Sequence, residues 1–118
     1  MPYEWLDAYL RAKPGAEKDY KPEWEATRYM VRGKMFCMIG HDKASEPIIS
    51  LKLDPARGDH LRQTYEDIIP GYYMNKDHWN SVYIDGEVPD DVLRGMADES
   101  HRLIFAALSQ KAQREILG

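Results

Sequence analysis

The stretch of this chain best suited to binding chemistry is residues 70–80, which read Pro-Gly-Tyr-Tyr-Met-Asn-Lys-Asp-His-Trp-Asn. A loop does not need Lys76 or His78 for its shape, so both side chains are candidates for contacting a ligand as hydrogen-bond donors. Trp79 offers a flat ring on which a nucleic-acid base can stack, although tryptophan serves more often as a packing anchor. These three residues make this stretch the first candidate binding site.

The same stretch carries the signals of a shaped loop. Pro70 and Gly71 break a preceding helix, because proline lacks an N–H group and glycine is conformationally free. Asn75 and Asn80 tolerate a left-handed backbone and hydrogen-bond their own main chain. We therefore expect a loop whose two ends are held by the two asparagines.

Basic residues form a second candidate set. Residues 26–60 contain six Lys and Arg against four Asp and Glu, whereas the whole chain has a net charge of −4. An acidic chain argues against a strong general attraction to nucleic acid, so any phosphate contact must come from a local surface. Solvated charge is the alternative explanation for these cations. The candidate phosphate contacts are Arg28, Arg32, Lys34, Lys52 and Lys76.

No group of residues has a spacing typical of catalysis or metal binding. The sequence offers no Ser/His/Asp or Cys/His set that spacing alone can nominate for nucleophilic catalysis. No two histidines lie three or four residues apart, and none stands beside the single cysteine; they are His41, His60, His78 and His101. We predict a non-catalytic protein without a metal or other cofactor.

The single cysteine, Cys37, allows no disulfide within the chain and suits a reducing compartment. It lies in the apolar run 35–39, where a thiol usually acts as a small hydrophobic group. No apolar run approaches the roughly 20 residues of a membrane helix, and residues 1–10 lack the pattern of a secretory signal. We predict a cytoplasmic protein.

Alternation of apolar and polar residues predicts strands. Residues 27–31 and 35–39 form a hairpin around Arg32-Gly33-Lys34, in which glycine supplies the positive φ. Further strands are expected at 48–53 and 81–85, with short extended pieces at 68–69 and 72–74. Residues 17–24 are mostly charged and contain Pro22, so we expect an ordered connector there.

Helical spacing of apolar residues predicts the other elements. Residues 3–12 and 55–65 form short helices, the second of which begins at Asp54-Pro55, where the carboxylate accepts from free amide groups. Residues 89–108 give the strongest helical pattern. Ser109 then caps a short final helix that runs through residue 117.

The order of these elements predicts one α+β domain over residues 1–118, with an antiparallel sheet and helices packed on one face. Tyr72 and Trp79 are expected near the edge of this sheet. The face away from the helices should show the side chains of Arg28, Ser50, Lys52 and Tyr83, with Arg32 and Lys34 at the hairpin tip. An open sheet face with basic and aromatic groups can hold a ligand.

Five short segments, taken in order, resemble the MmcQ/YjbR family. They are Gly33-Lys34-Met35-Phe36; Ile49-Ser50-Leu51-Lys52 with Asp54-Pro55; Pro70-Gly71-Tyr72; Asn75-Lys76 with His78-Trp79-Asn80; and Val88-Pro89-Asp90. The resemblance covers most of the chain, from about residue 14 to residue 117. It implies a CyaY-like α+β fold, described for the family as a double-wing arrangement and labelled DNA-binding.

Two functions remain open at this point. The first is a small non-catalytic protein that binds double-stranded DNA through the basic sheet face, the hairpin tip and the loop, with Arg28, Arg32, Lys34, Lys52, Lys76, His78 and Trp79 as contacts. The second is a module that binds a protein or a small anionic ligand on the same surface, with no nucleic-acid role. Salt distinguishes them, because binding to a phosphate backbone weakens steeply as salt rises.

Overall fold

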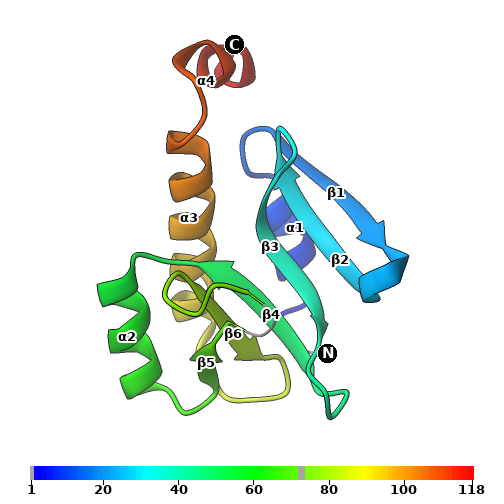
Figure 1. The fold of residues 1–118 in the computed structure, drawn as a ribbon, viewed down its shortest axis with the longest axis vertical. Coiled ribbons are helices and arrows are strands. Elements are labelled where there is room, and N and C mark those ends of the chain that lie inside the picture. The colour runs from blue at the N-terminus through cyan, green and yellow to red at the C-terminus, as the bar shows by residue number, and fades with distance from the viewer. Residues whose placement is uncertain (1, 72–73) are drawn as a thin grey trace.

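The computed structural model describes residues 2–71 and 74–118, which form one six-stranded antiparallel sheet and four α-helices (Figure 1). The strand order across the sheet is β1-β2-β3-β4-β6-β5, and every neighbouring pair is antiparallel. The strands are β1 (Ala16–Lys21), β2 (Ala26–Val31), β3 (Lys34–His41), β4 (Pro47–Lys52), β5 (Ile68–Pro70) and β6 (Trp79–Tyr83). The predicted antiparallel α+β class is confirmed.

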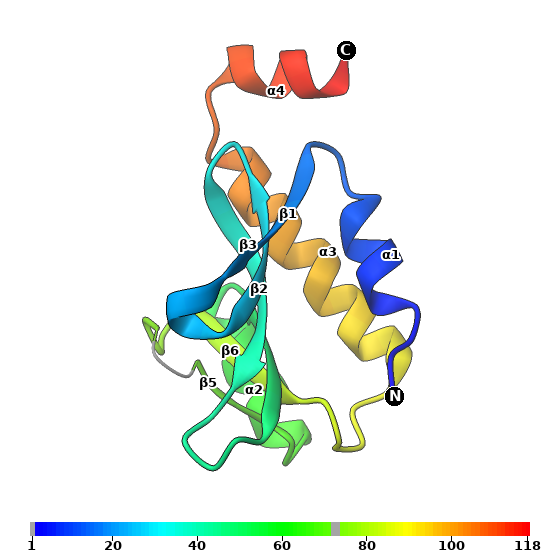
Figure 2. The same ribbon diagram turned by 90° about the vertical axis from the view of Figure 1, so that its right-hand side faces the viewer.

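Three helices lie against one face of this sheet: α1 (Leu6–Arg11), α2 (Pro55–Thr64) and α3 (Asp90–Ala106) (Figure 2). Lys18 of β1 donates to Asp7 of α1 at 2.7 Å, and Ser100 of α3 donates to the Phe36 carbonyl of β3 at 2.5 Å. Arg62 of α2 donates to Asn80 of β6. The helices are therefore segregated to one side, as predicted, and we call it the helix-side face.

The segment predicted as a connector at residues 17–24 is instead an edge strand. β1 pairs along its whole length with β2, from Ala16 opposite Val31 to Lys21 opposite Ala26. A short 3₁₀ helix, η1 (Pro22–Trp24), follows directly, because Pro22 has no N–H group to continue the ladder. The charged composition of β1 hid the strand, since an edge strand exposed to solvent needs no apolar alternation and charge protects its edge from other chains.

The β2–β3 hairpin is confirmed, with a two-residue turn. Arg32 has φ 51° and Gly33 has φ 79°, the pair of positive values that suits the twist of a tight hairpin. Lys34 therefore begins β3 and is not part of the turn. A register shift between Tyr29 and Met30 then places an extra residue in β3. This bulge lets both Phe36 and Cys37 enter the core, where neither is exposed.

The core lies between the helix-side face and α3. Leu51 of β4 and Leu93 and Met96 of α3 are fully buried there. The predicted helix at 89–108 is confirmed, and its apolar stripe is the one that packs on the sheet. Ser100, in the middle of that stripe, accepts the Lys52 backbone N–H at 2.9 Å and so ties the helix to β4.

Helices α2 and α4 begin as predicted, with one difference. α2 starts at Pro55, but the Asp54 side chain caps nothing, and the Asp54 backbone N–H donates to Glu99 of α3 at 2.9 Å. α4 (Gln110–Leu117) is capped by Ser109, whose hydroxyl accepts the Ala112 N–H at 3.1 Å. Within residues 2–71 and 74–118, no helix has the length and apolar character needed to cross a membrane.

Candidate functional site

The face of the sheet that no α-helix covers is assembled from alternate residues of the strands. Residues opposite each other in an antiparallel pair point to the same side, so one row runs from Arg28 through Met38 and Ser50 to Ser81. The neighbouring pairs are Lys52 with Trp79 and Ile48 with Tyr83. We call this surface the open sheet face: Arg28, Met30, Met35, Met38, Ile48, Ser50, Lys52, Trp79, Ser81 and Tyr83. The prediction that Arg28, Ser50, Lys52 and Tyr83 share one face is confirmed.

The centre of the open sheet face is closely packed although no helix lies over it. Ser50 and Ser81 are fully buried, and their hydroxyl groups are 2.7 Å apart. Met38 is also buried, whereas Lys52 and Trp79 are partly exposed. Groups able to contact a ligand therefore surround this packed centre.

The loop from residue 74 to residue 78 lies on the same side of the sheet as the open face, away from α3 (Figures 1 and 2). Asn75 shapes it, because its side chain accepts the Asp77 N–H at 2.9 Å and its carbonyl accepts the Trp79 N–H at 2.9 Å. Lys76 donates to the Gly71 carbonyl at 3.3 Å. The predicted turn role of Asn75 is confirmed; the predicted edge position of Tyr72 lies outside the described residues.

The predicted role of Asn80 as the second end of the loop is wrong. Asn80 lies within β6, is fully buried and points to the helix side, where it accepts from Arg62 of α2. Trp79, predicted near the sheet edge, begins the same strand, one strand in from the edge. Neither asparagine has a positive φ. Asn80 is thus a structural link between β6 and α2.

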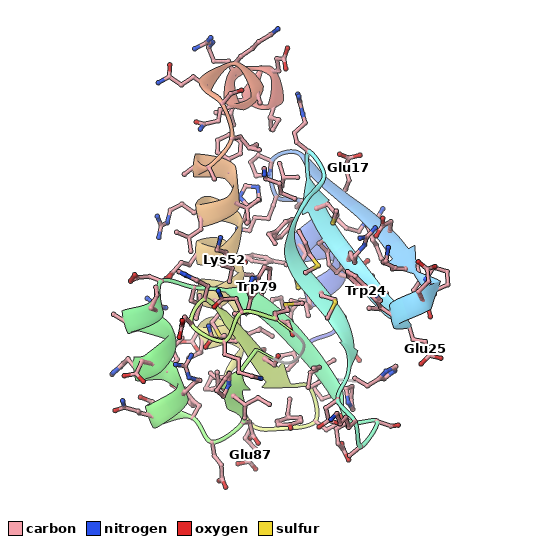
Figure 3. All side chains as sticks on the ribbon, in the orientation of Figure 1. Glu17, Trp24, Glu25, Lys52, Trp79 and Glu87 are labelled. Atoms are coloured by element: carbon pink, nitrogen blue, oxygen red, sulfur yellow. The ribbon has the colours of Figure 1, made fainter. Side chains whose placement is uncertain are left out.

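The structure brings part of the predicted basic set around Trp79. Lys52 is the cross-strand partner of Trp79, and His78 directly precedes Trp79. The Gly71 N–H donates to the Trp79 carbonyl at 2.6 Å, and the Gly71 carbonyl accepts from Lys76. Figure 3 shows Lys52 and Trp79 close together over the middle of the molecule. Arg32 lies in the β2–β3 turn and Lys34 begins β3 directly after it, so these two residues form a separate group.

Two of the five predicted cations are already paired with carboxylates. Arg28 donates twice to Asp19, at 2.8 and 2.6 Å, and this contact lowers the pKa of Asp19. Arg32 donates to Glu115 of α4 at 3.2 Å. Lys34 and Lys52 have no ion-pair partner in the described part of the chain. The charge available to an outside ligand is therefore smaller than the sequence suggests.

The exposed Trp24 was not among the site residues selected from the sequence. Trp24, at the end of η1, is 53% exposed, with the Lys21 ammonium 4.9 Å and the Arg28 guanidinium 5.6 Å from the centre of its ring. Figure 3 places it beside β1 and β2. The sequence shows Trp24 as an isolated tryptophan in a charged segment. It becomes a candidate binding residue only when β1 is recognised as a strand beside β2.

Residues 2–71 and 74–118 contain no cluster of metal-ligating side chains. No group of three or more His, Cys, Asp or Glu side chains there is placed to hold a metal ion. Cys37 is fully buried, and burial raises the pKa of its thiol, so it remains protonated at neutral pH.

Comparison with known proteins finds relatives that match this chain over most of its length and most of theirs. A family model described as YjbR matches residues 11–103. The uncharacterized protein YjbR of Escherichia coli K12 is 34% identical over 106 residues, which cover 90% of this chain and 89% of that protein. The uncharacterized protein YbdF of Escherichia coli O157:H7 is 34% identical over 97 residues, 82% of this chain and 77% of that protein.

A solved structure supports the same assignment. The crystal structure of Deinococcus radiodurans protein DR2400, of the DUF419 domain family, matches with a TM-score of 0.83 at 27% identity, covering 94% of this chain and 84% of that one. The family model, the two relatives and this structure agree with the segments that carried the resemblance in the sequence. The chain belongs to the YjbR family.

Proposed function

We propose that this protein is a non-catalytic binding module that holds single-stranded nucleic acid on its open sheet face. The observation that carries the proposal is the placement of two tryptophans with cations on a side that no α-helix covers. Trp79 pairs with Lys52 across strands, and Trp24 has the Lys21 ammonium 4.9 Å and the Arg28 guanidinium 5.6 Å from its ring centre. A flat ring with a neighbouring cation can stack a base and contact its phosphate.

A single strand suits this surface better than a duplex does. A duplex is held chiefly by neutralised phosphates, and Arg28 and Arg32 would first have to leave Asp19 and Glu115. Stacking of one base on an aromatic side chain contributes about 1–3 kcal/mol and depends little on net charge. An acidic chain can therefore bind a single strand with few phosphate contacts.

The test is fluorescence anisotropy with a labelled oligothymidine of about 12 nucleotides. We expect it to bind more tightly than a duplex of the same length. Between about 50 mM and about 200 mM salt, its affinity should fall with the shallow slope of about two neutralised phosphates. Trp24→Ala and Lys52→Ala should weaken binding, whereas Lys111→Ala on α4 serves as the control. Equal affinity for all these variants, or no binding at low salt, would refute the proposal.

A protein partner is the second candidate, favoured by the methionines of the open sheet face. Met30 and Met35 are partly exposed and lie opposite each other, next to the buried Met38. Methionine adapts its shape to different apolar partners, which suits it to protein-binding surfaces. Such a partner would occupy the same open sheet face, so it should compete with oligothymidine, and its own binding should be nearly insensitive to salt.

A further inference from the structure

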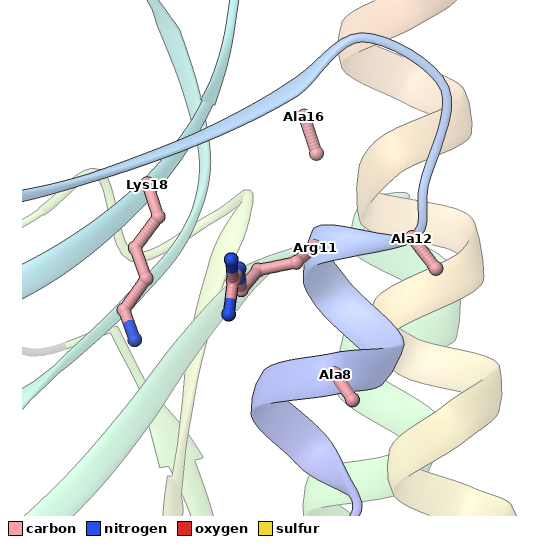
Figure 4. A pocket seen from close by; sticks show the side chains of 5 residues that line it. All are labelled: Ala8, Arg11, Ala12, Ala16 and Lys18. Carbon is pink, nitrogen blue, oxygen red and sulfur yellow. The ribbon is translucent and has the colours of Figure 1, made fainter.

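We propose that the groove between α1 and β1 binds a small organic anion, with Arg11 and Lys18 as the cationic contacts. The groove has a volume of about 740 Å³ and is lined by Ala8, Arg11, Ala12, Ala16 and Lys18 (Figure 4). It lies on the helix side of the sheet, so it is separate from the open sheet face. The inference stands whether or not that face binds nucleic acid.

The two cations are held close together by one carboxylate. Lys18 contacts one oxygen of Asp7 at 2.7 Å, and Arg11 approaches the other oxygen at 3.5 Å. The Tyr29 hydroxyl donates to the same Asp7 at 2.8 Å. The hydrogen bond from Lys18, followed by that from Tyr29, lowers the pKa of Asp7, so this carboxylate stays ionised at neutral pH. Two positive charges thus face one negative charge.

Both cations keep donors for a second anion. A guanidinium group has five N–H donors and an ammonium group has three, and the contacts with Asp7 use only some of them. The side chains of Arg11 and Lys18 remain 62% and 41% exposed. Figure 4 shows both extending into the space between α1 and β1. A ligand anion can therefore contact both groups without displacing Asp7.

The rest of the groove suits an apolar body attached to that anion. Ala8 and Ala12 come from α1 and Ala16 from β1, so the side chains that line the groove beside the two cations are small methyl groups. Methyl groups leave the groove open and favour contact with carbon rather than with water. The ligand class is accordingly a carboxylate or phosphate monoester joined to a compact apolar or aromatic group.

The experiment is a titration of ¹⁵N-labelled protein followed by amide chemical shifts, with phenyl phosphate, benzoate and inorganic phosphate as separate probes. We expect saturable shifts at Ala8, Ala12, Ala16 and Lys18 with the two organic anions. Inorganic phosphate should bind more weakly, because it lacks the apolar body. The difference between phenyl phosphate and benzoate identifies the preferred anion. Absence of saturable shifts here with both organic probes would overturn the proposal.

Variants of the charged residues distinguish a site from a structural contact. R11Q and K18Q should each weaken binding of the organic anion by about fivefold, the effect of one exposed charge pair. D7N should strengthen it, because the competing carboxylate is lost while an acceptor for Tyr29 remains. K111Q, on exposed α4, is the matched control, and melting temperatures check that each variant folds. If D7N and K18Q change affinity in the same direction, or R11Q binds like the wild type, the assignment fails.

Discussion

The two faces of the sheet in this YjbR-family protein differ in how fully packing explains their residues. On the helix-side face, Leu51 is completely buried, and Ser100 satisfies backbone groups of both Phe36 and Lys52. On the open side, Trp24 is 53% exposed, and Lys52 has no ion-pair partner among the described residues. Packing explains Leu51 and Ser100. It does not explain why Trp24 is exposed or why Lys52 carries a charge left unpaired by the described residues.

That difference indicates which substitutions should affect stability and which should affect ligand binding. Substitutions on the helix-side face remove buried area or leave buried polar groups unpaired, so they act on the free energy of unfolding. Substitutions of exposed groups on the open side change little that folding depends on, so their effects should appear in ligand binding. Measuring both properties for matched positions tests this separation.

The largest effect is expected for Leu51→Ala on the helix-side face. It should lower the free energy of unfolding by about 3–5 kcal/mol, because it removes a fully buried side chain and leaves a cavity. Its neighbour Ser50 points to the opposite face, and Ser50→Ala should cost only about 1 kcal/mol through the lost contact with Ser81. Urea unfolding of the two variants checks the contrast. Equal costs would show that the open face is as much a core as the helix side.

Gly71→Ala should cost about 1–3 kcal/mol, because the added methyl group has no room. Its Cβ would lie 2.5 Å from the Trp79 Cβ and 2.8 Å from the Trp79 carbonyl oxygen. Gly95→Ala in α3 is the matched control: its Cβ would meet only the end of Arg57, at 3.5 Å, and a helix gains up to about 1 kcal/mol from the change. Thermal unfolding measures both variants. If Gly71→Ala is as stable as the wild type, the contact between Gly71 and Trp79 is not tightly packed.

The two asparagines of the loop region should also differ. Asn80→Ala removes a buried acceptor from Arg62 and should cost about 1–3 kcal/mol. Asn75→Ala removes an exposed turn contact to the Asp77 N–H, and its cost should stay near 1 kcal/mol or below. Chemical denaturation distinguishes them. The reverse order would contradict the assignment of Asn80 as the link between β6 and α2.

Acid should weaken the contact that joins α1 to α3. Burial would raise the pKa of Asp98, but hydrogen bonds from Lys13 and from Tyr9, at 2.6 Å, outweigh it, so the pKa lies below the ordinary 3.8. A lowered pKa in the folded state stabilises the fold above the unfolded-state value, and this stability is lost as pH falls through the folded-state value. Unfolding midpoints at pH 6 and pH 3 should therefore differ less for Asp98→Asn than for the wild type. Exposed Asp85→Asn is the control, and an unchanged pH dependence in Asp98→Asn would contradict the expectation.

The smallest stability effects are expected for Lys76→Ala and His78→Ala in the loop. Both should stay within roughly 0.5 kcal/mol of the wild type, as exposed or half-buried polar substitutions usually do. Lys76→Ala should nevertheless weaken binding of oligothymidine and make its salt dependence shallower, because one charge fewer is available. If these variants prove as destabilising as Asn80→Ala, the loop is a structural brace and not part of a binding surface.

Much of the fold could be predicted from periodicity because long regular elements carry strong local signals. The α3 helix and the β2–β3 hairpin follow from apolar spacing and from Gly33. β1 did not follow, because its charged residues are stabilised by pairing with β2 rather than by their own propensity. Asn80 was misjudged because the strand begins at Trp79, two residues before the predicted start, which turns a loop end into a buried strand position.

The candidate site could be predicted only in part, because its charge depends on residues far apart in the sequence. Arg32 meets Glu115 from α4, and no local pattern links those positions. Arg28 meets Asp19 only because β1 lies beside β2. Trp24 gained its importance from the same strand pairing. The sequence shows which residues are cationic or aromatic. Only the three-dimensional arrangement shows which of these cations are already paired with a carboxylate.

The most direct test of the central claim is a map of amide chemical shifts on adding oligothymidine to ¹⁵N-labelled protein. We predict that the shifts concentrate on β2, β4 and β6 and around Trp24, Lys52 and Trp79, while the amides of α3 around Leu93 and Met96 stay unchanged. Shifts confined to the helix side, or no shifts at protein concentrations that saturate a weak complex, would contradict the assignment of the open sheet face as the binding surface.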